Sequence, residues 1–167
     1  MEKLENFCKL AVKKGAKEAK IISTDSIVVS GWVRWKCKFG CDGYGESLTC
    51  PPFSPTPEET REVLKSYKKA ILIHGDEHTD VSEIAVYLER EIFLKDYYKA
   101  FAMGSGPCRL CTDCDVKKTC KNAYLARPSM EACGIDVYQT VRNNRFEIHV
   151  VKDSGCKANY FGLVLVF

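Results

Sequence analysis

The sequence predicts an α/β protein in which helices pack on a mixed β-sheet and two irregular cysteine-rich loops interrupt the regular structure. Three observations indicate this. Segments with helical spacing alternate with short apolar strands, two stretches combine cysteine with glycine and proline, and the chain has 167 residues. That length fits one domain, residues 1–167, with the cysteine loops at 31–56 and 104–134. A hydrophobic fraction of 46% is typical of a globular protein that forms its core without cross-links.

The N-terminal segment predicts a helix followed by strands. Across residues 2–20, apolar side chains recur at helical spacing, with Gly15 as an early stop or kink. Cys8 lies on the apolar stripe of this helix, which favours a packed core thiol over a metal ligand. Residues 20–23 and 26–29 are rich in isoleucine and valine and predict strands.

The middle of the chain predicts alternating helices and strands. Thr56 is a suitable N-cap, followed by proline and two acidic residues, so we expect a helix over 57–67. A buried strand at 70–74, an amphipathic helix over about 80–94 and a strand at 97–103 follow.

The C-terminal part predicts short helices and a hairpin. Short helices are expected within 128–143. Two apolar runs, 146–151 and 160–167, flank a turn at 153–155 and predict the paired strands of a hairpin.

Residues 31–56 are expected to lack regular structure, because they contain four glycines and three prolines. The same stretch holds three cysteines and two tryptophans, Trp32 and Trp35, which we expect to shield a bound group or to pack in the core. A loop this long in a small domain needs another source of order. Bound metal would supply it.

The strongest chemical motif is Cys108-x2-Cys111-x2-Cys114-x5-Cys120. Three thiolates at this spacing can wrap three corners of an iron–sulfur cubane, and a fourth thiolate closes the site. The common bacterial run is C-x2-C-x2-C-x3-C-P, whereas here the last gap is five residues and Lys121 replaces the proline. A four-cysteine zinc site is the main rival, since paired C-x2-C spacing also suits zinc.

A second motif, Cys37-x3-Cys41-x8-Cys50, lies within the first loop. Pro51 and Pro52 follow it directly and stiffen the chain. Radical enzymes that use S-adenosylmethionine carry C-x3-C-x2-C, and the gap of eight residues excludes that pattern. The three cysteines therefore indicate a metal site without identifying a reaction.

Three cysteines leave one corner of a cubane to be filled. Cys133 is the preferred fourth ligand, although it is equally well explained as a small apolar residue at a tight turn. If Cys133 is not a ligand, the corner is open to water or substrate, which would point toward catalysis. Cys156 has no cysteine close to it in the sequence and is treated as incidental.

The remaining features indicate the compartment and exclude some partners. The first residues lack the apolar core of a signal peptide, and no apolar run approaches a membrane span, so a cytoplasmic protein without membrane contact is expected. Thiols stay reduced there, which favours metal over disulfides, although hyperthermophiles keep the disulfide alternative open. A net charge of +3 with interspersed signs gives no nucleic-acid-binding stripe.

Taken together, the motifs resemble those of domain-of-unknown-function family 2284, whose members are predicted metal-binding proteins typical of anaerobes. The resemblance covers nearly the whole chain and implies metal binding through the cysteines, with iron–sulfur favoured; it implies no reaction. The motifs that carry it are Cys37-x3-Cys41-x2-Tyr44-Gly45-x4-Cys50-Pro-Pro, Gly106-Pro-Cys108-x2-Cys111 with Cys114 and Cys120, and Ala126-Arg-Pro-Ser-Met-Glu-Ala-Cys-Gly-Ile-Asp136.

The sequence thus predicts an iron–sulfur protein with one or two [4Fe-4S] clusters, acting in electron transfer or as a redox accessory beside a redox partner protein. Two alternatives stay open: an enzyme with a substrate-accessible cluster, and a zinc-stabilised binding module. No catalytic motif is identified, so the sequence does not decide whether the protein is an enzyme. The candidate ligands are Cys37, Cys41, Cys50, Cys108, Cys111, Cys114, Cys120 and Cys133.

Overall fold

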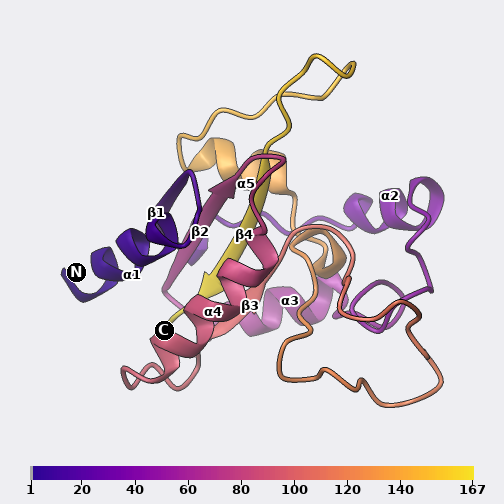
Figure 1. The fold of residues 1–167 in the computed structure, drawn as a ribbon, viewed down its shortest axis with the longest axis horizontal. Helices are drawn as coiled ribbons and strands as arrows, with labels where there is room; N and C mark the ends of the chain where they lie inside the picture. The colour runs from indigo at the N-terminus through magenta and orange to yellow at the C-terminus, as the bar shows by residue number, and fades with distance from the viewer. Residues whose placement is uncertain (1) are drawn as a thin grey trace.

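The computed structural model describes residues 2–167 and confirms the α/β class, with helices packed on a β-sheet (Figure 1). Within that part of the chain the sheet has four strands, in the spatial order β1-β2-β4-β3. They are β1 (Glu18–Ser23), β2 (Lys69–Gly75), β3 (Phe101–Met103) and β4 (Tyr160–Leu165). The apolar runs expected at 20–23, 70–74, 97–103 and 160–167 each overlap one of these strands.

The direction of the strands differs from the mixed sheet expected from the sequence. Within residues 2–167, each pair of neighbouring strands is antiparallel. The connections between successive strands are all long, at 24–68, 76–100 and 104–159. A connection of that length can return the chain in either direction, so the pattern of apolar residues does not determine how the strands pair.

One face of the sheet is covered by α1 (Glu2–Lys13) and α4 (Val81–Phe93) (Figure 1). Alternate strand residues such as Ile71 and Val164 pack there with the apolar sides of both helices. The N-terminal helix ends at Lys13, and Gly15, expected as an early stop or kink, adopts φ +112° just beyond it. Such a left-handed conformation ends a helix and suits glycine.

The opposite face packs against α5 (Val137–Asn143) and the irregular chain around it. Leu72 and Leu163 point to this side, as period-two alternation requires, and Val141 of α5 lies in the same cluster. The short helices expected within 128–143 are α5 and a 3₁₀ turn, Glu131–Cys133. The core therefore lies on both faces of one sheet.

The predicted pairing of 146–151 with 160–167 is wrong. β4 pairs with β2 on one edge and with β3 on the other, so neither edge is free for another strand. Phe146 and Ile148 are buried, but they pack against the sheet as irregular chain. Their alternating pattern reflects burial and not strand pairing. The strand expected at 26–29 is likewise a 3₁₀ turn, Thr24–Ser26, followed by a single bridge at Val29.

The helices with strong local start signals form as expected. α3 (Pro57–Leu64) begins with a complete capping box, in which Thr56 Oγ1 accepts from the Glu59 amide at 3.1 Å and Glu59 Oε2 accepts from the Thr56 amide at 2.7 Å. Asp80 caps α4 in the same way, accepting from the Glu83 amide at 2.9 Å. These caps satisfy amides that a helix leaves unpaired at its start.

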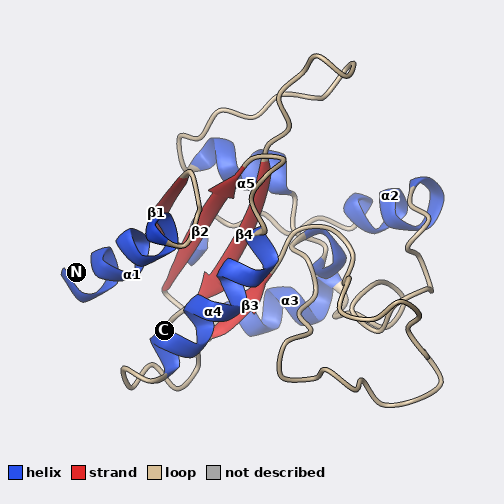
Figure 2. Cartoon of the chain, viewed as in Figure 1, coloured by secondary structure: helices blue, strands red, loops and turns tan. Residues whose placement is uncertain are grey.

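The first cysteine segment is not irregular throughout, which corrects the expectation for 31–56. Residues Trp32–Gly40 form helix α2, and only the remainder, 41–56, lacks regular helices and strands (Figure 2). Two of the four glycines, Gly31 and Gly40, stand at the ends of α2, where they do not interrupt it. The second segment, expected over 104–134, is irregular from 104 to 130, and the 3₁₀ turn Glu131–Cys133 follows. None of the helices in residues 2–167 combines the length and apolar character needed to cross a membrane.

Candidate metal centre

The two cysteine segments lie side by side, and Gly43 marks the place where they meet (Figure 1). A Cβ atom built on Gly43 would lie 3.6 Å from Cys41 Sγ, 3.8 Å from Cys50 Sγ and 3.7 Å from Pro107 Cβ. Two thiols from the first segment and the residue before Cys108 of the second thus surround one small space. Because Gly43 has no side chain, that space is open.

Helix α2 and the turn after it bring three thiols together. Cys37 lies in the last turns of α2, and Cys41 follows directly after the helix. Burial raises the pKa of the Cys37 and Cys50 thiols, and the neighbouring Cys41 thiolate raises the pKa of both further. The three thiols therefore belong to one part of the structure, at the end of α2 and in the chain that follows it.

Arg34 holds α2 in place. Its Nη1 donates to Ser54 Oγ at 3.1 Å, to the Pro55 carbonyl at 2.8 Å and to the Ala132 carbonyl at 2.7 Å. Ser54 Oγ also donates to the Ala132 carbonyl, at 2.7 Å. These bonds join α2, the end of the first cysteine segment and the Glu131–Cys133 turn, so they fix the position of Cys37.

The second cysteine segment forms a hollow, and all four of its cysteines line it. The hollow is small, about 20 Å³, which is room for one atom of the size of water. Residues just before Cys50 form part of its wall, so this hollow also lies between the two segments. The lining residues are Ser47, Leu48, Thr49, Cys108, Leu110, Cys111, Cys114, Cys120, Asn122 and Ala126.

Asn122 is a site residue that the sequence did not reveal. Its Nδ2 atom donates to Cys111 Sγ at 3.1 Å. Donors to ligand sulfurs stabilise the thiolate form and raise the potential of an iron–sulfur cluster. An asparagine two residues after the last cysteine of the motif has no spacing rule that would have identified it.

The base of the second segment is clamped to α4, whereas its tip is exposed. Arg127 makes two bonds with Glu89 of α4, Nε to Oε2 at 2.8 Å and Nη2 to Oε1 at 2.5 Å. Glu89 Oε2 also accepts from the Ala102 amide of β3 at 2.6 Å. The Gly104 amide donates to the Pro128 carbonyl at 2.9 Å, which closes the base. The cysteines are thus carried on a loop with fixed ends.

Cys108 is the cysteine that connects the two groups. It lines the hollow with Cys111, Cys114 and Cys120, and its charge also raises the pKa of Cys50. Cys108, which belongs to the second segment, therefore also lies close to the first, where Pro107 approaches Gly43.

Cys133, the fourth ligand preferred from the sequence, lies in a different environment. It is fully buried in the core with Met130 and Ile135, and burial raises its pKa to about 12. Its carbonyl accepts from Thr60 Oγ1 at 2.7 Å, which ties it to α3. Cys156 lies in a turn, with Sγ 3.6 Å from Asp153 Oδ1.

Glu131 is a second residue that sequence reasoning missed. Its Oε2 atom is buried and has no hydrogen-bond partner, and it is the single side-chain oxygen or nitrogen of this kind within residues 2–167. Burial raises the pKa of this carboxyl, and its charge raises the pKa of Cys37 and Cys133. A carboxyl oxygen without a partner is unusual and needs an explanation.

The thiols are not arranged as the coordination sphere of one ion. Among residues 2–167, no three His, Cys, Asp or Glu side chains are gathered closely enough to hold a single metal ion. All ten cysteines are free thiols. The fit of a metal group therefore depends on two features: the space beside Gly43, which a methyl group would fill, and the hollow lined by four thiols.

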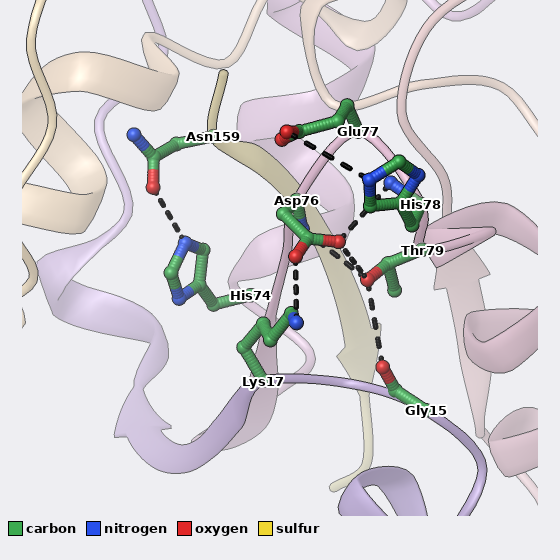
Figure 3. Close-up of polar contacts among 8 residues, drawn as sticks. All are labelled: Gly15, Lys17, His74, Asp76, Glu77, His78, Thr79 and Asn159. Atoms are coloured by element: carbon green, nitrogen blue, oxygen red, sulfur yellow. Dashed lines mark hydrogen bonds and ion pairs between the residues drawn. The ribbon is translucent and has the colours of Figure 1, made fainter. Parts of the chain in front are cut away.

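A separate polar cluster surrounds Asp76 after β2 (Figure 3). Asp76 pairs with Lys17 at 2.6 Å and accepts from Thr79 Oγ1 at 2.9 Å. The two nearby histidines do not share a site: His74 Nε2 bonds Asn159 Oδ1 at 2.7 Å and its ring stacks on Phe161, whereas His78 is exposed. These contacts are structural.

Comparison with protein families identifies one described as "Predicted metal-binding protein (DUF2284)", whose model matches residues 20–166. The matched range contains all eight candidate ligands, and it confirms the resemblance drawn from the motifs. Comparisons with curated proteins and with solved structures found no match.

Proposed function

The chain belongs to this family of predicted metal-binding proteins, and on that premise we propose that it is an iron–sulfur protein that transfers electrons. One observation carries the proposal. Two cysteine segments that are far apart in the sequence lie side by side and share the space at Gly43, which a single methyl group would fill. A fold that leaves such a space between thiols is suited to a bound group.

We assign the thiols to two [4Fe-4S] clusters. Cys108, Cys111, Cys114 and Cys120 line one hollow and would hold the first cluster. Cys41 and Cys50 lie beside the space at Gly43 and, with Cys37 at the end of α2, would hold the second. When bound, each cluster supplies a one-electron redox centre.

Cys133 stays a core thiol in this proposal. Ligation requires the thiolate, and burial in an apolar cluster opposes thiolate formation at this position. Arg34 lowers the pKa of both Cys37 and Cys133, but burial raises the pKa of both, and at Cys133 the pKa reaches about 12. The fourth position of the second cluster is then taken by a ligand other than cysteine.

Several residues of the chain support the assigned thiolates. The Asn122 amide donates to Cys111, and Arg34 holds the helix that carries Cys37. Ligands of this kind must remain reduced, so the proposal also places the protein in the cytoplasm of an anaerobe.

Metal analysis of protein purified without oxygen tests the proposal. We expect about eight irons and about eight acid-labile sulfides per chain, following from two four-iron clusters. Cys37→Ser and Cys114→Ser should each remove about four irons, whereas the matched control Cys156→Ser should remove none. Iron and sulfide near zero in the unaltered protein would refute the proposal.

Catalysis is a second candidate function, and the three-thiolate site favours it. A cluster with one position free of cysteine can bind a substrate, and the unpartnered Oε2 of Glu131 adds a buried carboxyl whose charge reaches Cys37. A shift in the electron paramagnetic resonance spectrum on adding small carboxylates or thiols would support an enzyme. An unchanged spectrum would leave electron transfer as the function.

A zinc-stabilised binding module is favoured by the size of the hollow. Its volume of about 20 Å³ has room for one ion, for which the four thiols would have to draw together, whereas the cubane requires the exposed loop from Cys108 to Cys120 to move outward. A colourless protein with about one zinc per chain and no sulfide would establish this alternative.

A further inference from the structure

One face of α2 exposes three large aromatic side chains. Trp32 is 46% exposed, Trp35 72% and Phe39 77%. They are three and four residues apart, so they share one side of the helix. The sequence led us to expect the tryptophans to shield a bound group or to pack in the core; both side chains instead face outward. Tryptophan and phenylalanine are seldom exposed together in this way on a protein without partners.

The opposite side of α2 attaches the helix to the protein. Val33 is buried, and Arg34 donates to the Ala132 carbonyl. Cys37 is half-buried on this side, and Cys41 follows directly after the helix. The contacts that hold α2 in place therefore do not involve its aromatic face. Figure 1 shows the helix projecting beside the cysteine segments. The fold therefore does not require aromatic side chains at these positions.

The charge on α2 has one sign. Lys36 and Lys38 are exposed, and the helix contains no acidic residue. Interfaces commonly combine an aromatic centre with charged residues at the rim, and tryptophan is the residue most enriched among those that dominate binding. A basic rim attracts an acidic partner and excludes basic ones.

We propose that this face of α2, defined by Trp32, Trp35, Lys36, Lys38 and Phe39, is the docking surface for an acidic protein that carries one electron at a time. The inference rests on the proposed function, because it places the partner against the helix that carries Cys37. A helix with its side chains is about 10 Å across, so a partner docked there brings its redox centre near the cluster. In that complex one electron would pass from the partner's centre, which would be oxidised, to the cluster, which would be reduced; the same contact would serve transfer in the opposite direction.

A protein partner fits better than a membrane. α2 has nine residues, and its aromatic side chains lie directly across the helix from the thiol of Cys37. Insertion into lipid would bring no redox centre to that thiol. The membrane and a second copy of this chain are therefore outcomes that would overturn the inference.

The test uses the loaded protein with two purified carriers, an acidic ferredoxin and the basic carrier cytochrome c. Binding is measured by calorimetry and electron transfer by stopped-flow absorption, at low and high salt. We expect binding to ferredoxin but not to cytochrome c, with an affinity that falls as salt rises. Trp35→Ala, Phe39→Ala and the pair Lys36→Glu with Lys38→Glu should each weaken binding by about tenfold or more.

Tyr98→Ala is the matched control, because Tyr98 is also 77% exposed but lies after α4. It should bind and react as the unaltered protein does. Iron and sulfide are measured in every variant, and they should not change.

The outcomes separate the two claims. Normal iron content with equal binding by all variants would overturn the docking surface alone. Trp35-dependent binding to vesicles of anionic phospholipid, or a Trp35-dependent dimer in sedimentation, would overturn it as well. A protein without iron would overturn the proposed function and, with it, the inference that depends on it.

Discussion

Replacing Gly43 with alanine would place a methyl carbon in the space between the two cysteine segments. That carbon would lie 3.6 Å from Cys41 Sγ and 3.8 Å from Cys50 Sγ, and 3.7 Å from Pro107 Cβ. These are ordinary van der Waals distances, so the metal-free fold has room for the methyl group. Gly43 does not adopt a left-handed conformation, so alanine is not strained there.

The expected effects on the free and the loaded protein have opposite signs. In the metal-free protein, Gly43→Ala should leave the free energy of unfolding unchanged or raise it by up to about 1 kcal/mol, because alanine restricts the unfolded chain. In the loaded protein, the added methyl carbon would touch the sulfurs of both Cys41 and Cys50, and it would occupy the space in which the cluster has to bind. Iron content should therefore fall by about four per chain, the content of one cluster.

Gly40→Ala is the matched control. A Cβ at Gly40 meets nothing within 4 Å, and this residue ends the same helix. Both variants are loaded with iron and sulfide without oxygen and compared by metal analysis and by urea unfolding of the metal-free forms. If Gly43→Ala takes up as much iron as Gly40→Ala, the space at Gly43 is not a cluster site and the reasoning fails.

Three further predictions test the buried Cys133 thiol, the separate Asp76 cluster and the Arg127–Glu89 pair at the base of the second segment. In the metal-free protein, iodoacetamide at pH 8 should label exposed Cys41 and leave Cys133 unlabelled until the protein unfolds. The reason is that a pKa raised from 9.0 to about 12 lowers the thiolate fraction of Cys133 about a thousandfold. Equal labelling of both cysteines by peptide mass spectrometry would contradict the buried position. The hydrogen bond from Lys17 holds the pKa of the Asp76 carboxyl well below its usual value of 3.8, so this group stabilises the fold above that pH and the contribution is lost as pH falls. Asp76→Asn should therefore flatten the acid limb of a stability profile below about pH 4, and parallel profiles for both proteins would count against the pair. Arg127→Ala leaves Glu89 without its partner in a largely buried place and should cost about 2–4 kcal/mol of unfolding free energy; a change below about 0.5 kcal/mol in urea unfolding would show that the clamp is not needed.

The sequence predicted the helix starts and ends that depend on residues close to them in the chain. Thr56 predicted the start of α3, the apolar pattern predicted a helix over about 80–94 that contains α4, and Gly15 marked the end of the N-terminal helix. Helix α2 was missed because glycines were counted without regard to position: Gly31 and Gly40 stand at its ends. A glycine at either end of a helix does not weigh against it.

Contacts between distant segments were not predictable in the same way. Strand direction and the partners of β4 depend on how long connections return, which the apolar pattern does not encode. The nearness of Cys108 to Cys50, the bond from Asn122 to Cys111 and the buried oxygen of Glu131 all arise from the same kind of contact. The cysteine spacing identified the donor set, and only the fold shows which thiols share a space.

Anomalous diffraction at the iron absorption edge, from crystals grown without oxygen, tests the central claim most directly. Two peaks are predicted, one among Cys37, Cys41 and Cys50, and one in the hollow lined by the four later cysteines. Peaks at the zinc edge in these places, or no peak at either edge, would contradict the account.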